Sequence, residues 1–301
     1  MNKIQKKYSG VIVPMISPFT KELYIDLQAV ERILETFLQT NVSPFLAGTT
    51  GESVSISDSQ KLVLIKKAID FVNHRTIVYV GISGNCLQES IENAKKYADL
   101  GADVVVAHLP FYYPISDDQM LRYFEQLANN VPCPLILYNI PVTTKQSIPL
   151  DVIDKLSYHS NIVGIKDSEK GIERLDKSLE IWKDRTDFVH LMGAAVQSAH
   201  ALLHGSDGII PSTGNLVPKL YSDMVKAALR NDIEVVNELQ DRTNRISEIY
   251  QKDKNLSQSI PALKVMMSVC GLCEPYVMPP MYELNRNEQE LVREATKNVL
   301  V

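Results

Sequence analysis

Residues 135–166 read LILYNIPVTTKQSIPLDVIDKLSYHSNIVGIK and contain two short apolar runs, at 135–138 and 162–166, on either side of a more polar segment. Short runs rich in branched apolar residues are typical of buried parallel strands. Pro149 and Asp151 mark the start of a helix between them, since proline suits a first helical turn and an acid complements the helix dipole. The stretch therefore predicts a strand, a helix and a second parallel strand.

The same alternation extends along most of the chain and predicts eight strands. They are expected at 11–15, 44–47, 77–80, 103–107, 135–138, 162–166, 188–192 and 208–210. Between them lie segments with helical periodicity, such as the one after Ser57, which places Leu62, Ile65, Ile69 and Val72 on one face. Ser57 or Asp58 would cap that helix, and Ser116 another.

Eight βα units favour a closed (β/α)₈ barrel, an α/β fold of the TIM-barrel type, over an open doubly wound sheet. An open parallel sheet of that size usually carries a nucleotide fingerprint. The sequence contains no Gly-x-Gly-x-x-Gly motif and no phosphate-binding loop ending in Gly-Lys-Ser. We expect the barrel to occupy residues 1–231 and a helical extension to occupy 232–301, with prolines 261, 275, 279 and 280 as breaks.

Composition narrows the class of partner. The 301 residues are 45% hydrophobic and 22% charged with a net charge of −5, as in a globular protein that does not bind nucleic acid. Pro14 and Pro18 interrupt the first apolar stretch before it could act as a signal segment or a membrane span. We expect a cytoplasmic protein that acts on a small molecule.

The sequence patterns that would indicate a metal or redox site are weak. Cys270 and Cys273 have redox spacing, but there is no second such pair, and four cysteines do not form a disulfide framework in a chain of this length. His200 and His204 have the spacing of a zinc pair without an evident third ligand. Gly81-Ile82-Ser83-Gly84 lacks the second glycine of a nucleophile elbow. We expect no metal, no cofactor and no hydrolase triad.

Lys166 closes the apolar run at 162–166 and precedes Asp167 and Ser168. Burial lowers the pKa of an amine toward the neutral form that attacks carbonyl groups, so Lys166 is the leading candidate for a Schiff-base residue. The alternative is a lysine whose stem covers apolar surface while its head stays in water. The segment alone leaves both interpretations open.

Other polar residues also follow predicted strands, where a barrel places its active site. Gly48-Thr49-Thr50-Gly51-Glu52 can hold a carboxylate, or it is a simple turn. Tyr138-Asn139-Ile140-Pro141 puts a phenol on the strand next to Lys166, where it can shuttle protons or act only as a core aromatic. The aromatic loop from His108 to Pro114 is a rim or subunit contact, or part of the site.

Together, Gly48-Thr49-Thr50-Gly51-Glu52, Tyr138-Asn139-Ile140-Pro141 and Gly164-Ile165-Lys166-Asp167 resemble the motifs of the dihydrodipicolinate synthase and N-acetylneuraminate lyase family. The resemblance covers nearly the whole chain and implies a class I aldolase that handles pyruvate on a (β/α)₈ barrel.

The resemblance also implies roles for individual residues. Lys166 forms the imine with pyruvate and Tyr138 is the general acid and base. Thr49 and Thr50, with Gly48 of the same turn, bind the pyruvate carboxylate and relay protons. Tyr112 matches an aromatic residue that reaches in from a neighbouring subunit, and Ile210 lines the pyruvate methyl group. The expected assembly is a homotetramer, a dimer of dimers.

Two departures from the motifs of the family point to the substrate, and a third, Phe111, concerns feedback regulation. Thr143 stands where the synthases usually carry an arginine for the carboxylate of their aldehyde, and Gly193-Ala194-Ala195-Val196 lacks the acids of the sialic-acid lyases. Phe111 replaces a tyrosine common beside the lysine-feedback site of regulated synthases. We therefore expect a 2-keto-3-deoxy sugar acid as substrate, with Thr143 leaving room for a polyhydroxy aldehyde. The alternatives are a synthase, an N-acetylneuraminate lyase, a sugar-acid dehydratase or a pyruvate-binding sensor without activity.

Overall fold

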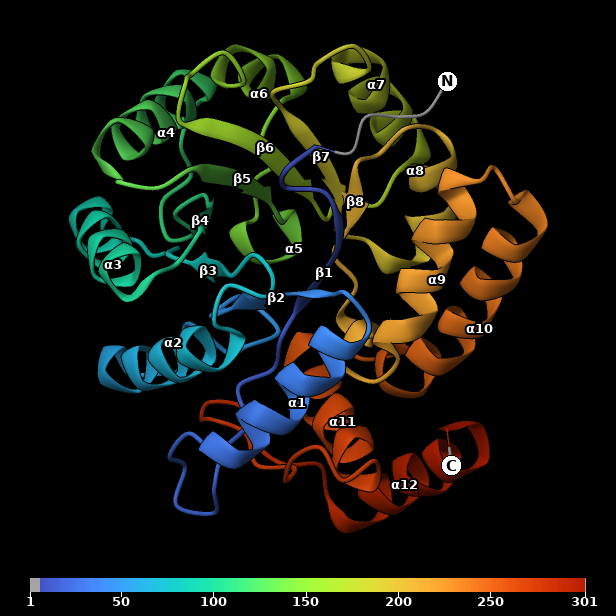
Figure 1. Cartoon of the computed structure of the whole chain (residues 1–301). Helices are drawn as coiled ribbons and strands as arrows, with labels where there is room; N and C mark the ends of the chain where they lie inside the picture. Colours follow the sequence, from blue (N-terminus) through green and yellow to red (C-terminus); the bar gives the residue numbers. More distant parts are fainter. Residues whose placement is uncertain (1–5, 301) are drawn as a thin grey trace.

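The computed structural model describes residues 6–300, and its eight strands close into one parallel barrel in the order β1 to β8 (Figure 1). The expected (β/α)₈ fold is confirmed. The strands are β1 Gly10–Pro14, β2 Ser43–Leu46, β3 Tyr79–Gly81, β4 Val104–His108, β5 Leu135–Asn139, β6 Ile162–Asp167, β7 Val189–Met192 and β8 Gly208–Ile209.

Helices surround the barrel as a ring, except that the short helix α5 lies toward its centre in Figure 1. They are α1 Leu27–Gln39, α2 Asp58–Val72, α3 Leu87–Leu100, α4 Asp117–Asn130, α5 Pro141–Thr144, α6 Leu150–Leu156, α7 Ile172–Trp182, α8 Ser198–Leu203 and α9 Pro218–Leu229, with short 3₁₀ turns at Ala195–Gln197 and Ser212–Asn215. The expected caps are present. The Ser57 hydroxyl accepts from the Gln60 amide at the start of α2, and Ser116 forms a capping box with Gln119 at the start of α4.

Most strand boundaries lie within one residue of the prediction, and the differences are largest in relative terms at β3 and β8. β3 begins at Tyr79 rather than at residue 77, and β8 has only two residues. A Cβ on Gly208 would lie 2.3 Å from the carbonyl oxygen of Gly10 on β1, so the barrel closes at a point where only glycine fits.

Alternation along the strands divides the core into two layers. Ile136 and Tyr138 belong to a cluster inside the barrel, while Leu135 and Leu137 belong to the larger cluster between strands and helices. The inner face of β5 therefore carries Tyr138 to its carboxyl end. Tyr138 pairs with His108 of β4 on one side and with Lys166 of β6 on the other.

Three further helices follow the barrel: α10 Ile233–Gln251, α11 Leu256–Val269 and α12 Arg286–Leu300. Helix α10 packs on α8 and α9, and α11 packs between α10 and α12. In Figure 1 α11 and α12 lie in the same region as α1, and the Arg32 side chain of α1 donates to the carbonyl of Leu272 (3.3 Å). Within residues 6–300 no helix is both long and apolar enough to span a bilayer.

Candidate active site

Lys166 lies near the carboxyl end of β6 and is buried inside the barrel, with 3% of its surface exposed. Its Nζ atom is 3.8 Å from the centre of the Tyr138 ring and 4.8 Å from the centre of the Phe45 ring. Burial lowers the pKa of Lys166, and the adjacent Tyr138 opposes only part of that shift. The snorkelling alternative is wrong, because the ammonium does not reach bulk water.

His108 and Tyr138 line the barrel beside this amine. Their ring centres are 6.0 Å apart, and both side chains are buried. The Nδ1 atom of His108 is 2.7 Å from the Leu109 carbonyl oxygen, and burial lowers the pKa of His108. The neutral imidazole of His108 adds no second positive charge beside the Lys166 amine.

The turn after β2 has an unusual backbone. Ala47 and Glu52, at its two ends, adopt left-handed conformations with φ of 50° and 58°. The amides of Gly51 and Ser53 donate to the Gly48 carbonyl, at 3.1 and 3.3 Å. These bonds hold the turn closed on itself.

Thr49 and Thr50 lie at the centre of the turn. Across residues 6–300, neither their backbone N–H groups nor their hydroxyls have a hydrogen-bond partner in the protein. Unused donors clustered in one turn are the arrangement that binds a carboxylate.

A cavity of about 160 Å³ opens at the carboxyl-terminal ends of the strands and connects these features. Its wall consists of Pro14, Thr49, Thr50, Tyr138, Ile140, Val142, Lys166, Ser168, Lys170, Gly193, Ala194, Ala195, Val196, Ile210, Ser212, Gln251 and Leu256.

Five of the predicted residues meet at this cavity: Thr49, Thr50, Tyr138, Lys166 and Ile210. Thr143 does not line it, because its hydroxyl lies 3.2 Å from the Ile140 carbonyl in α5, and the neighbouring Val142 lines the wall instead. Gly48 lies behind the wall, where a Cβ would be 2.9 Å from the Phe45 ring.

Tyr112 is not among the residues that line the cavity of its own chain. It is 73% exposed and packs edge-on against Tyr113, with ring centres 4.9 Å apart. Its backbone and that of Phe111 are fixed by the Asn85 side chain.

Sequence reasoning missed several wall residues. Ser168 and Lys170 follow β6, Ser212 follows β8, and Gln251 and Leu256 come from the extension. The rule that sites lie after strand ends could have identified the first three. No local pattern marks Gln251 or Leu256, which reach the site only because α10 and α11 return to the barrel.

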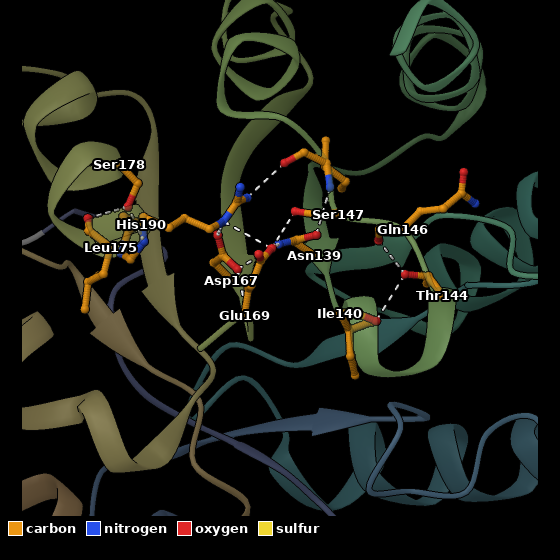
Figure 2. Close-up of polar contacts among 12 residues, drawn as sticks. Asn139, Ile140, Thr144, Gln146, Ser147, Asp167, Glu169, Leu175, Ser178 and His190 are labelled. Carbon is orange, nitrogen blue, oxygen red and sulfur yellow. Dashed lines mark hydrogen bonds and ion pairs between the residues drawn. The ribbon is translucent and has the colours of Figure 1, made fainter. Parts of the chain in front are cut away.

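A polar network behind the strands fixes the ends of β5 and β6 (Figure 2). The Asn139 amide donates to Asp167 and to Glu169, at 2.9 Å each, and the Ser147 hydroxyl donates to Glu169. Arg174 donates to Asp167 through Nε (2.8 Å). Because Asn139 follows Tyr138 and Asp167 follows Lys166, this network fixes the relative position of the phenol and the amine.

Burial alone would raise the pKa of Glu169. Hydrogen bonds from Ser147 and Asn139 and the charge of Arg174 outweigh it and lower the pKa. The lowered pKa keeps Glu169 in the carboxylate form that accepts from Ser147 and Asn139.

The histidine and cysteine patterns do not converge. His200 Nε2 is 2.6 Å from an Asp176 carboxylate oxygen, and the rings of His200 and His204 stack. Burial raises the pKa of Cys273 to about 12. Among the described residues there is no group of three His, Cys, Asp or Glu side chains that could hold a metal ion.

The sequence matches a known protein family. The model of the dihydrodipicolinate synthetase family matches residues 7–299. The chain belongs to that family.

Relatives within the family include both synthases and aldolases. The 4-hydroxy-tetrahydrodipicolinate synthase of Alkalilimnicola ehrlichii is 31% identical over 291 residues, covering 96% of this chain and 98% of that protein. The probable 2-dehydro-3-deoxy-D-pentonate aldolase YjhH of Escherichia coli K12 is 28% identical over 291 residues, covering 95% and 96%. The crystal structure of E. coli K12 YagE in complex with pyruvate superposes with a TM-score of 0.92 at 26% identity, covering 98% and 99%.

The predicted family, and with it the prediction of a pyruvate-dependent lyase, is confirmed.

Proposed function

We propose that this chain is a class I aldolase that cleaves a 2-keto-3-deoxy sugar acid to pyruvate and an aldehyde through an imine on Lys166. The observation that carries the proposal is the buried amine of Lys166, 3.8 Å from the Tyr138 ring, in the same cavity as the unused donors of Thr49 and Thr50. The cavity thus combines a nucleophile with a site for the carboxylate next to the reacting carbonyl.

The first steps form the imine. The neutral Lys166 amine adds to the C2 carbonyl, and Tyr138 protonates the oxygen and then assists its departure as water. Thr49 and Thr50 hold the C1 carboxylate and relay protons to Tyr138. The protonated imine then withdraws electrons from C3.

Cleavage follows from that electron demand. Removal of the proton from the C4 hydroxyl, by Tyr138 or a substrate carboxylate, sends the electrons of the C3–C4 bond into an enamine and releases the aldehyde. Protonation at C3 and attack of water on the imine release pyruvate and restore Lys166. Ile210 lies on the cavity wall, where it would contact the pyruvate methyl group. No step requires a metal or an organic cofactor.

The cavity wall supports a hydroxylated substrate. Ser168, Ser212 and Gln251 provide neutral hydrogen-bonding groups, and among residues 6–300 no aspartate or glutamate lines the cavity. The resemblance to YjhH and YagE supports the same class, whereas the synthase relatives and the cation of Lys170 on the wall support dihydrodipicolinate synthesis as a second candidate. Thr143 would contribute only if its hydroxyl left the Ile140 carbonyl.

Assembly and location are part of the proposal. We place this chain in a cytoplasmic homotetramer, a dimer of dimers, with residues 1–231 as the barrel and 232–301 as the extension. The exposure of Tyr112 and Tyr113, 73% and 72%, supports a subunit contact at the aromatic loop. Light scattering on the wild type and on Tyr112→Ser tests that contact.

The test of the reaction is borohydride reduction in the presence of pyruvate. A stable adduct on Lys166, located by peptide mass mapping, is expected for the wild type, and none for Lys166→Ala. An adduct on another residue would refute the proposal. Pyruvate release from a panel of 2-keto-3-deoxy acids, compared with consumption of pyruvate and aspartate semialdehyde, separates aldolase from synthase. Release of water without pyruvate would indicate a dehydratase, and binding without turnover would indicate a sensor.

A further inference from the structure

The mechanism makes no use of a buried ion pair that lies beside the carboxylate-binding turn. Glu52 ends that turn and Lys264 lies in α11, and their side chains form a salt bridge with 0% of either exposed. Taking two charges out of water costs several kcal/mol per ion, and replacing such a pair by apolar residues is often neutral for stability. A contribution to the free energy of unfolding therefore does not explain why the chain has this buried pair.

The ammonium of Lys264 joins four segments. Besides Glu52, it donates to the carbonyl of Ser17 after β1 (2.7 Å) and to that of Tyr276 after α11 (2.8 Å). The other oxygen of Glu52 accepts from the Met278 amide (2.7 Å). The polar atoms of the pair are therefore hydrogen-bonded to the barrel through Ser17 and to the extension through Tyr276 and Met278.

Ser17 closes a ring of contacts around the turn. Its hydroxyl donates to the Gly51 carbonyl (2.7 Å), while its own carbonyl accepts from Lys264. Lys264 therefore holds both of the last two residues of the turn, Glu52 directly and Gly51 through Ser17.

The turn needs such support because its backbone is strained. Glu52 has φ of 58°, and a non-glycine residue in that region persists only where tertiary contacts impose it. If Glu52 returned to an extended conformation, the preceding Thr49 and Thr50 donors would leave the cavity wall.

We propose that Glu52 and Lys264 are positioning residues that hold the turn in its carboxylate-binding conformation, so that the C-terminal extension sets the affinity for pyruvate. The inference rests on the proposed function, in which Thr49 and Thr50 bind the pyruvate carboxylate. Tyr138 lies on β5 and Lys166 on β6, and across residues 6–300 neither side chain forms a hydrogen bond or ion pair with Glu52 or Lys264. The pair acts through the turn, so its loss should chiefly weaken pyruvate binding and, because Thr49 and Thr50 also relay protons to Tyr138, slow trapping at saturation by a smaller factor.

The test measures borohydride trapping of the full-length protein as a function of pyruvate concentration, which requires no knowledge of the aldehyde. In the double variant Glu52→Met/Lys264→Met the half-saturating pyruvate concentration is expected to rise roughly 10- to 100-fold, with the trapping rate at saturation within about threefold of wild type. The control is Asp70→Asn, which removes the exposed Lys66–Asp70 pair of α2 and should leave both quantities unchanged.

Outcomes separate this inference from the proposed function. If the wild type is trapped on Lys166 and the folded double variant has wild-type pyruvate dependence, the positioning role is refuted while the aldolase proposal stands. If the wild type is not trapped at all, the proposed function fails. Glu52→Gln, which keeps the side-chain shape, repeats the measurement if the double variant does not fold, and failure of both to fold would show a purely structural pair and overturn the inference.

Discussion

Gly164 on β6 sets the distance between β6 and β7, and its replacement by alanine should affect both stability and imine formation. A Cβ at this position would lie 2.3 Å from Cγ2 of Val189 and 2.7 Å from the Val189 carbonyl oxygen. The methyl contact could be relieved by a side-chain rotation, but the carbonyl belongs to the strand paired with β6. The two strands must therefore separate.

Overpacking of a rigid core costs typically 1–3 kcal/mol, and the backbone contact places Gly164→Ala in the upper half, at about 2–3 kcal/mol. For a chain of this size roughly 2 °C of melting temperature corresponds to each kcal/mol, so we expect a decrease of about 4–6 °C. Lys166 lies two residues further along β6. A displacement of its amine by 1 Å relative to Tyr138 would slow imine formation by up to about 100-fold.

Thermal unfolding by circular dichroism and the rate of borohydride trapping with pyruvate measure the two effects. Gly84→Ala is the matched control, because its Cβ would meet nothing closer than the Ser90 hydroxyl at 3.6 Å. A Gly164→Ala protein that melts within 1 °C of wild type, and is trapped at the same rate, would refute the argument from strand separation.

Three further outcomes follow from the site. Tyr138→Phe keeps the ring beside Lys166 but removes the proton shuttle, so the rate of imine formation measured by rapid quench should fall about 100-fold or more, and an unchanged rate would exclude that role. Burial holds the folded-state pKa of Lys166 below the ordinary 10.5, so between these two pKa values the unfolded state binds more protons than the folded state. As pH falls through that range, the free energy of unfolding of the wild type should decrease relative to that of Lys166→Met, and below the folded-state pKa the two pH curves should run parallel. Urea unfolding that gave the same difference between the two proteins at every pH would contradict this. Arg174→Met leaves Asp167 without its ionic partner and should cost about 1.5–3 kcal/mol in urea unfolding, whereas Arg122→Met on the exposed face of α4 should cost less than about 1 kcal/mol, and equal losses would count against the network.

The strands were predictable because burial on both faces leaves a direct signature in the sequence. Runs such as 104–106, three consecutive valines, are typical of a strand that is buried on both faces in an α/β protein. The lengths were less predictable. β8 has only two residues, and a Cβ on Gly208 would lie 2.3 Å from the Gly10 carbonyl oxygen of β1, a contact that depends on barrel closure and not on local preference.

The candidate site was predictable where its residues follow strand ends. Thr49, Tyr138 and Lys166 could be grouped because parallel strands present their carboxyl ends at one edge. Thr143 shows where that reasoning fails. It lies in the correct segment, but the turn of α5 directs its hydroxyl to the Ile140 carbonyl and places Val142 on the wall.

The sequence by itself determined the barrel, the family and the buried amine of Lys166, because periodicity and motif spacing record local burial and strand order. Only the tertiary structure decided which distant groups complete the site. Gln251 joins the cavity wall and Lys264 meets Glu52 because α10 and α11 fold back onto the barrel. Such contacts depend on packing between elements far apart in the chain, for which no local pattern of residues is required.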